Sequence, residues 1–140
     1  MSDKSIFIDT NVFVYAKLKT DAAKQKHQLA VERLRTLGAP AVVSTQVFVE
    51  FASVLLKNQI AEEQVRQAVQ DIATDSHVTP VTLNTVERAW NLKLRYRYSY
   101  WDSLILAAAL EAECTLLWTE DLQHGQVILD VLTVENPFVA

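Results

Sequence analysis

Short, continuous apolar runs alternate with longer segments of mixed polarity along this chain. A continuous apolar run is typical of a strand that is covered on both faces of its sheet. The runs that we predict as strands or extended links occupy residues 6–8, 41–43, 78–81, 115–118 and 127–134. The segments that we predict as helices occupy residues 12–16, 21–37, 45–58, 61–73, 84–97 and 99–110. This alternation predicts an α/β fold with a parallel sheet, helices on both faces and right-handed crossovers.

Local signals indicate where several helices begin and end. Gly38 is expected to end the second helix. Ser44 or Thr45 is expected to cap the third helix through its hydroxyl group. Ser99 begins the last helix, and Asp102 follows it at the spacing of a helix capping pattern.

Length and composition narrow the class of protein. The 140 residues indicate one domain, spanning residues 1–140, and the 50% hydrophobic content is enough for a core. The net charge of −4 disfavours a protein that coats nucleic acid. It does not exclude a nuclease, because a cluster of metal-binding acids lowers the net charge by itself.

Cysteine content and hydropathy add two further expectations. Cys114 is the single cysteine, so the chain has no internal disulfide or cysteine zinc site, and we expect this side chain to be a small buried one. No signal-peptide pattern precedes the first strand, and no run reaches the roughly 18–20 apolar residues that span a bilayer. We therefore expect a cytoplasmic enzyme or binding protein with no membrane association.

Four acidic residues occupy positions that surface acids would not require. Asp9 directly follows the first predicted strand, and Asp121 follows the strand at 115–118. Glu50 borders the apolar face of its helix, and Asp102 lies on the apolar line of the last helix. A simpler explanation exists for each: a turn or a helix cap for the three aspartates, and a half-exposed helix acid for Glu50. Because two strand ends and two helices aim carboxylates at one region, we predict one site.

Clustered carboxylates predict a hard divalent cation. They repel one another and raise one another's pKa, and the sequence places no lysine or arginine among them. Mg²⁺ or Mn²⁺ suits such oxygen ligands, whereas the scattered His27, His77 and His124 form no zinc pattern. A metal of this kind activates water and neutralises a phosphate, so the site suits phosphodiester hydrolysis, with a carboxylate as a possible proton acceptor.

Five segments together resemble the PIN-domain ribonuclease family, most closely the VapC-type toxins of toxin–antitoxin pairs. They are residues 8–12, Glu50, residues 100–105, residues 119–122 and residues 136–138. The resemblance covers essentially the whole chain. It implies a three-layer α/β/α fold with a central mainly parallel sheet. It also implies an endoribonuclease that depends on Mg²⁺ or Mn²⁺, forms a homodimer and is covered by a small antitoxin protein.

The resemblance also implies roles for individual residues. The catalytic acids would be Asp9, Glu50, Asp102 and Asp121. Asp9 and Asp102 are the first candidates for direct metal ligands, and the other two are further candidates. Asn11 and Thr119 match supporting polar positions that orient acids or water. Glu120 also matches, with the alternative that it only faces solvent.

Basic residues near the acids have two interpretations. Arg95 and Arg97 alternate with aromatic residues before Asp102, which suits contact with RNA phosphates and unpaired bases. The alternative is that they complement a helix C-terminus while the aromatic residues pack. Trp90 is predicted as a core or dimer-surface residue. A second basic region is interpreted as a solvated face; it contains Lys17, Lys19, Lys24 and Lys26.

Two other functions stay open from the sequence. One is a phosphatase that uses Asp9 as a covalent nucleophile, although such enzymes favour an acid two positions later, where this chain has Asn11. The other is a non-catalytic PIN module that binds RNA or a protein partner; the four acids argue against it.

Overall fold

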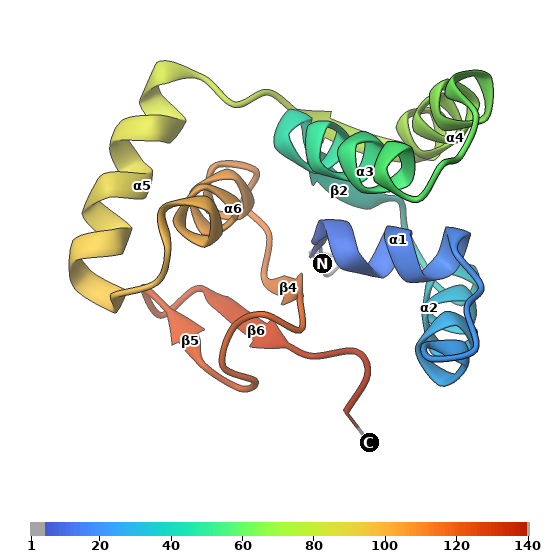
Figure 1. The fold of residues 1–140 in the computed structure, drawn as a ribbon. Helices are drawn as coiled ribbons and strands as arrows, with labels where there is room; N and C mark the ends of the chain where they lie inside the picture. Colours follow the sequence, from blue (N-terminus) through green and yellow to red (C-terminus); the bar gives the residue numbers. More distant parts are fainter. Residues whose placement is uncertain (1–4, 140) are drawn as a thin grey trace.

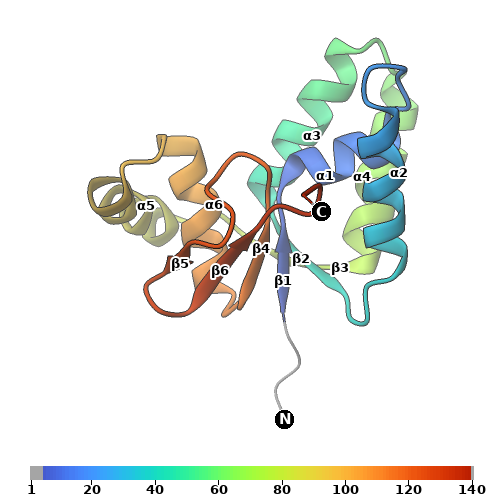
Figure 2. The ribbon, with the colours of Figure 1, turned by 90° about the horizontal axis from the view of Figure 1, so that it is seen from below.

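Figure 1 shows the fold of the chain. Six strands form one sheet in the order β3-β2-β1-β4-β6-β5, which can be followed in Figure 2. The computed structural model describes residues 5–139. Neighbouring strands pair in parallel, except that β5 and β6 pair antiparallel. The strands are β1 (Ile6–Ile8), β2 (Ala41–Ser44), β3 (Ser76–Thr79), β4 (Leu116–Trp118), β5 (Val127–Ile128) and β6 (Leu132–Glu135).

Helices cover both faces of this sheet, as Figure 2 shows: α5 and α6 lie on one side, and the helices that precede them in the chain lie on the other. They are α1 (Thr10–Lys17), α2 (Lys24–Arg35), α3 (Thr45–Lys57), α4 (Glu62–Asp75), α5 (Leu83–Tyr96) and α6 (Tyr100–Glu111). The first four helices lie in crossovers that run from β1 outward to β2 and β3, whereas α5 and α6 lie in the crossover that returns to β4. Right-handed crossovers in opposite directions place their helices on opposite faces.

The direction of the strand order reverses between β1 and β4, which pair in parallel at the centre of the sheet. Ile8 lies opposite Trp118, so both strands end at the same level. The backbone N–H of Asp9 donates to the Trp118 carbonyl at 3.0 Å, which extends the pairing by one residue. Ligands of open α/β sheets bind outside the carboxyl ends of strands at such a reversal.

Helix α6 is buried on nearly all sides, so it has almost no polar side. Its residues from Ser103 to Leu110 are all buried, because α5 packs on it from outside and the sheet covers it from within. Phe51 and Leu55 of α3 fill the other face of the sheet. Each such side chain contributes about 1.5–3 kcal/mol when fully buried.

Several local predictions need correction. The predicted strand region 127–134 is a hairpin, β5 and β6, because Leu129 and Asp130 take positive φ angles of 50° and 60° and reverse the chain. Such turns usually carry glycine or asparagine, so the sequence lacked the signal. Ser44 occupies the N-cap position of α3, but it makes no capping hydrogen bond, and its buried hydroxyl has no partner. The first residue of α3, Thr45, instead accepts a hydrogen bond from the Val81 N–H at 3.1 Å.

Two further side-chain predictions have clear outcomes. Cys114 is fully buried, as predicted. Trp90 is 51% exposed, so its assignment to the core is wrong; its ring lies against that of Tyr100, with centroids 4.9 Å apart. Among the residues that the structure describes, no helix has both the length and the apolar content needed to cross a bilayer.

Candidate active site

Asp9 is the buried centre of the site. It follows β1 and is the N-cap of α1, with only 5% of its surface exposed. Its Oδ1 accepts the Thr10 N–H at 2.7 Å, and its Oδ2 accepts the Thr119 hydroxyl at 2.8 Å. The capping role and the site role therefore coincide in one carboxylate, which is held by one donor that follows β1 and one that follows β4.

Glu50 reaches the site from α3 and is tied to its neighbours by both oxygens. Its Oε1 accepts the Thr10 hydroxyl at 2.8 Å, and its Oε2 accepts the Gln46 amide at 3.4 Å. The same amide of Gln46 donates to the Trp101 carbonyl at 3.2 Å. Gln46 therefore connects α3 to the first turn of α6 and holds Glu50 toward the space between them.

Asp102 lies in the first turn of α6, where the helix macrodipole favours a negative charge. The hydroxyl of Ser99 accepts the Asp102 N–H at 3.1 Å and so caps the helix, as predicted. Because the cap uses the backbone of Asp102, its side chain is left to face the pocket described below.

Asp121 differs from the other acids, because it lies in a loop after β4 and is exposed. Its Oδ2 accepts the Asn11 amide at 3.2 Å, and its N–H donates to the Thr119 hydroxyl at 3.1 Å. Asn11 and Thr119 therefore each form a hydrogen bond with an acid of the site, and their supporting role stays a prediction. Thr119 links the two aspartates, because its hydroxyl contacts Asp9 and Asp121 at once.

The four acids surround one pocket of about 580 Å³ at the strand-order reversal. Its lining comes from α1, α3, α6 and the loop after β4: Asp9, Thr10, Asn11, Val49, Glu50, Ser53, Val54, Lys57, Trp101, Asp102, Ile105 and Asp121. The structure thus brings together every acid that the sequence predicted for the site.

The surroundings of two acids in the pocket, Asp9 and Asp121, raise their pKa values. Burial raises the pKa of Asp9 to about 7, and the charges of Asp121 and Glu50 add to this rise, while the two hydrogen bonds oppose it. Burial is also the largest cause of the raised pKa of Asp121. The charges of Asp102, Glu120 and Glu50 raise this pKa further. A positive charge in the pocket would relieve both carboxylates.

The described residues, 5–139, contain no group of three acid, histidine or cysteine side chains that already stands in position to hold a metal ion. The acids border a common space without forming a complete coordination shell. Within the described part of the chain, the carboxylate of Asp121 accepts only the Asn11 amide and that of Asp102 accepts no hydrogen bond, so both keep oxygen atoms available to a ligand in the pocket. The donor set, all carboxylate oxygen, fits Mg²⁺ or Mn²⁺.

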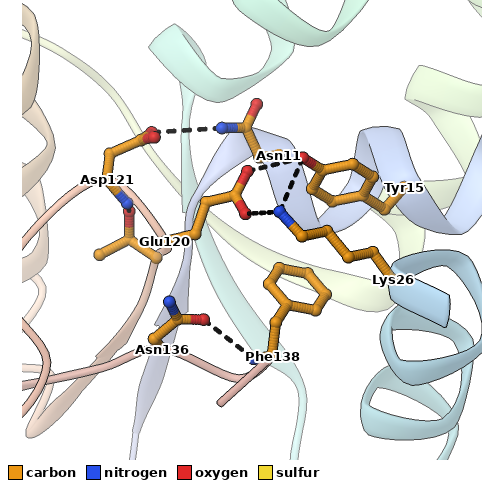
Figure 3. Close-up of polar contacts among 8 residues, drawn as sticks. Asn11, Tyr15, Lys26, Glu120, Asp121, Asn136 and Phe138 are labelled. Atoms are coloured by element: carbon orange, nitrogen blue, oxygen red, sulfur yellow. Dashed lines mark hydrogen bonds and ion pairs between the residues drawn. The ribbon is translucent and has the colours of Figure 1, made fainter. Parts of the chain in front are cut away.

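Glu120 does not simply face solvent, which corrects one of the two sequence interpretations. Its Oε1 accepts the Tyr15 hydroxyl at 2.7 Å, and its Oε2 pairs with the Lys26 ammonium at 2.7 Å (Figure 3). Lys26 was assigned to a solvated basic face, and it is in fact half of a salt bridge next to the site. No sequence spacing connects these three residues, which lie on α1, α2 and the loop after β4.

The cations of the site are not those that the sequence singled out. Arg95 and Arg97 are absent from the pocket lining; Arg95 lies 5.4 Å from the ring centre of Tyr96, and Arg97 ends α5 with a positive φ of 66°. The lining contains Lys57 instead. Lys57 follows Glu50 by seven residues, two helical turns, so this spacing was a signal that could have identified it.

The sequence model of the PIN domain family matches residues 6–127, and the chain belongs to this family. No curated protein sequence matches the chain significantly. PIN membership favours a nuclease over the phosphatase alternative. The predicted family and the predicted α/β fold with its mainly parallel sheet are thus confirmed.

Solved structures with the same fold include a toxin and complexes of toxin–antitoxin systems. VapC20 of Mycobacterium tuberculosis, a toxin that cleaves the sarcin–ricin loop, has a TM-score of 0.69 and 23% identity over 84% of this chain and 90% of that one. A toxin–antitoxin complex from Klebsiella pneumoniae has a TM-score of 0.70 and 19% identity over 96% and 98%. VapBC2 of Rickettsia felis, bound to promoter DNA, has a TM-score of 0.64 and 16% identity over 94% and 98%. At these identities, the likeness concerns the fold.

Proposed function

We propose that this protein is a metal-dependent endoribonuclease and the toxin of a VapBC-type toxin–antitoxin pair. The observation that carries the proposal is the convergence of Asp9, Glu50, Asp102 and Asp121 on one pocket at the strand-order reversal. Four elements that are far apart in the sequence deliver these carboxylates, and membership of the PIN family supports the same chemistry.

The proposed ligands of Mg²⁺ or Mn²⁺ are Asp9 and Asp102, with Glu50 and Asp121 as further ligands. The fit rests on the all-oxygen donor set and on the burial of Asp9, which raises the pKa of this carboxyl to about 7 and would be offset by a bound cation. A divalent cation bound there would supply charge neutralisation and Lewis acidity for phosphodiester hydrolysis.

The chain's own residues orient and balance the acids. Thr119 and the Thr10 N–H hold the carboxylate of Asp9, while Thr10 and Gln46 hold that of Glu50. A carboxylate that remains ionised at the pocket rim accepts a proton from the attacking water. Asp9 and Glu50 therefore need little reorganisation during the reaction, because their supporting donors are already in place.

RNA is the proposed substrate, and the cytoplasm is the proposed location of the protein. Lys57 on the pocket wall is suited to a phosphate, and Trp101, 62% exposed, is suited to stacking on an unpaired base. Arg95 and Arg97 remain candidates for contact with more distant parts of the RNA.

An antitoxin and a second copy of the chain are the proposed protein partners. Toxin–antitoxin complexes among the solved structures with this fold support the antitoxin. The homodimer is supported by an apolar stripe along α5, where Leu83, Trp90 and Leu94 are 73%, 51% and 74% exposed. Their spacing places all three on one side of the helix.

The test is cleavage of labelled cellular RNA by the purified protein with Mg²⁺ or Mn²⁺, compared with Asp102→Asn. We expect the variant to lose cleavage while its circular dichroism spectrum stays unchanged, because only one oxygen of a half-buried side chain is replaced. Asp71→Asn is the matched control, since Asp71 is exposed on α4 and outside the pocket.

Full activity of Asp102→Asn would overturn the proposal. Tight RNA binding without cleavage by the wild type, in either metal, would instead favour the non-catalytic PIN module.

A further inference from the structure

The acids of the site are not held equally well by the fold. Asp9 caps α1, Glu50 lies within α3 and Asp102 lies in the first turn of α6, so regular backbone fixes all three. Asp121 lies in the segment 119–126, between β4 and β5, which is neither helix nor strand. Backbone hydrogen bonds hold the two ends of this segment, at Thr119, Gly125 and Gln126, but none of those described involves residues 120–122. The position of Asp121 therefore depends on side-chain contacts from elsewhere in the molecule.

The strongest of these contacts reaches the loop one residue before Asp121. Lys26 of α2 and Tyr15 of α1 both bind the carboxylate of Glu120, each at 2.7 Å and each through a different oxygen. The Lys26 ammonium also approaches the Tyr15 hydroxyl at 3.5 Å. Figure 3 shows the resulting triangle of polar groups, with Asn11 and Asp121 beside it.

Phe138, in the C-terminal segment, packs against Tyr15 and Lys26. The ring of Phe138 meets that of Tyr15 edge to face at 5.2 Å, and the Lys26 ammonium lies 5.1 and 5.7 Å from the centres of the two rings. The Phe138 N–H donates to the Asn136 side chain at 2.9 Å, which fixes the bend of this segment. Glu120 is consequently only 15% exposed at its side chain, although Lys26 is 44% exposed.

We infer that Lys26 and Tyr15 are positioning residues: by binding Glu120 they hold the loop after β4 so that Asp121 stays in the active-site pocket. The inference rests on the proposed nuclease function. Neither residue lines the pocket, so both contact the loop through Glu120 and not through RNA or metal. The charge of Lys26 also opposes the rise in the pKa of Asp121.

The main effect of these contacts is to restrain the loop that carries Asp121. An exposed ion pair alone contributes little to stability. Here, however, the pair is joined by the Tyr15 hydroxyl and two aromatic rings, and it restrains residues 120–122, which make no backbone–backbone hydrogen bond within the described part of the chain. When it is broken, the remaining ties of Asp121 are the Asn11 contact of 3.2 Å and the Thr119 contact of 3.1 Å. The loop then samples positions in which the carboxylate leaves the pocket.

The experiment compares the full-length wild type with Lys26→Met, Glu120→Gln, the double variant and the conservative Lys26→Arg. Lys24→Met is the matched control, because Lys24 is exposed on the same helix, α2, and the net charge changes equally. Three quantities are measured: hydrogen exchange of the amides at 119–123, Mn²⁺ affinity by titration calorimetry, and kcat and KM for RNA cleavage.

We expect Lys26→Met and Glu120→Gln each to weaken Mn²⁺ binding and lower kcat by about 10-fold, the size typical of residues that support metal ligands. KM should change less than about two-fold, because Lys26 is outside the pocket. Exchange at 119–123 should accelerate. The double variant should be no worse than either single one, Lys26→Arg should recover most of the loss, and Lys24→Met should match the wild type.

Unchanged loop exchange and unchanged Mn²⁺ affinity in Lys26→Met would overturn the inference. So would a rise in KM at constant kcat, since that result would assign Lys26 to direct RNA contact. If the wild type cleaves no RNA, the nuclease proposal fails separately. Exchange and Mn²⁺ affinity then decide the positioning role, because neither readout requires turnover.

Discussion

Asp9 should make the metal-free protein less stable as the pH rises, and its replacement by asparagine should remove that loss. The carboxylate is buried at the end of β1, and no cation contacts it among the described residues. Burial raises the pKa of Asp9 from an ordinary value of 3.8 to about 7 in the folded protein. Between these two values the unfolded chain ionises Asp9 while the folded chain keeps it protonated, so folding loses free energy over this range.

The magnitude follows from the two pKa values. A separation between 3.8 and about 7 corresponds to about 4 kcal/mol, with the full loss reached above about pH 7. Asparagine keeps an acceptor for the Thr10 N–H but weakens the contact with the Thr119 hydroxyl, at a cost of about 1 kcal/mol. Asp9→Asn should therefore be about 1 kcal/mol less stable than the wild type near pH 4 and about 3 kcal/mol more stable at pH 8.

Urea unfolding in EDTA at pH 4, 6 and 8 measures this difference directly. Asp71→Asn, an exposed substitution on α4, controls for the loss of one negative charge. At pH 8, Mn²⁺ should restore stability to the wild type, by about 2.7 kcal/mol at a hundred times its Kd, and do nothing for Asp9→Asn.

A constant stability difference between wild type and Asp9→Asn from pH 4 to pH 8 would refute the reasoning. It would mean that the charged carboxylate is solvated in the folded protein and that no cation is needed to balance it.

Three further outcomes test individual contacts. Thr119→Val removes the hydroxyl that contacts Asp9 and Asp121, so RNA cleavage should fall about 10-fold while the fold, followed by circular dichroism, persists. Ser99→Ala removes a helix cap and should lower the urea-derived unfolding free energy by about 1 kcal/mol, whereas Ser44→Ala, at a cap position without a capping bond, should not lower it; equal losses would contradict the cap assignment. Burial raises the pKa of Cys114 to about 11, so iodoacetamide at pH 8 should label it only after unfolding, and rapid labelling of the native protein would contradict its burial.

The strands and helices were largely predictable because their signals are local. The apolar runs at 6–8, 41–43 and 115–118 each contain or overlap a buried strand, and the helix that begins at Ser99 is capped as its sequence indicates. The hairpin at 127–135 was missed, since Leu129 and Asp130 reverse the chain without a typical turn residue.

The acids of the site were predictable for a different reason. Parallel strands share one carboxyl edge, so an acid directly after β1 and another after β4 had to approach each other once those strands were neighbours. The periodicity of α3 and α6 then indicated that Glu50 and Asp102 face inward.

The sequence by itself therefore determined the α/β class, the family and the candidate acids, because each depends on runs and spacings within a short stretch of chain. The tertiary structure alone decided what surrounds those acids. It placed Lys57 on the pocket wall and brought Tyr15 and Lys26 to Glu120, from helices about a hundred residues away along the chain. Contacts of this kind leave no periodic trace, since they depend on the three-dimensional distance between elements and not on spacing along any one of them.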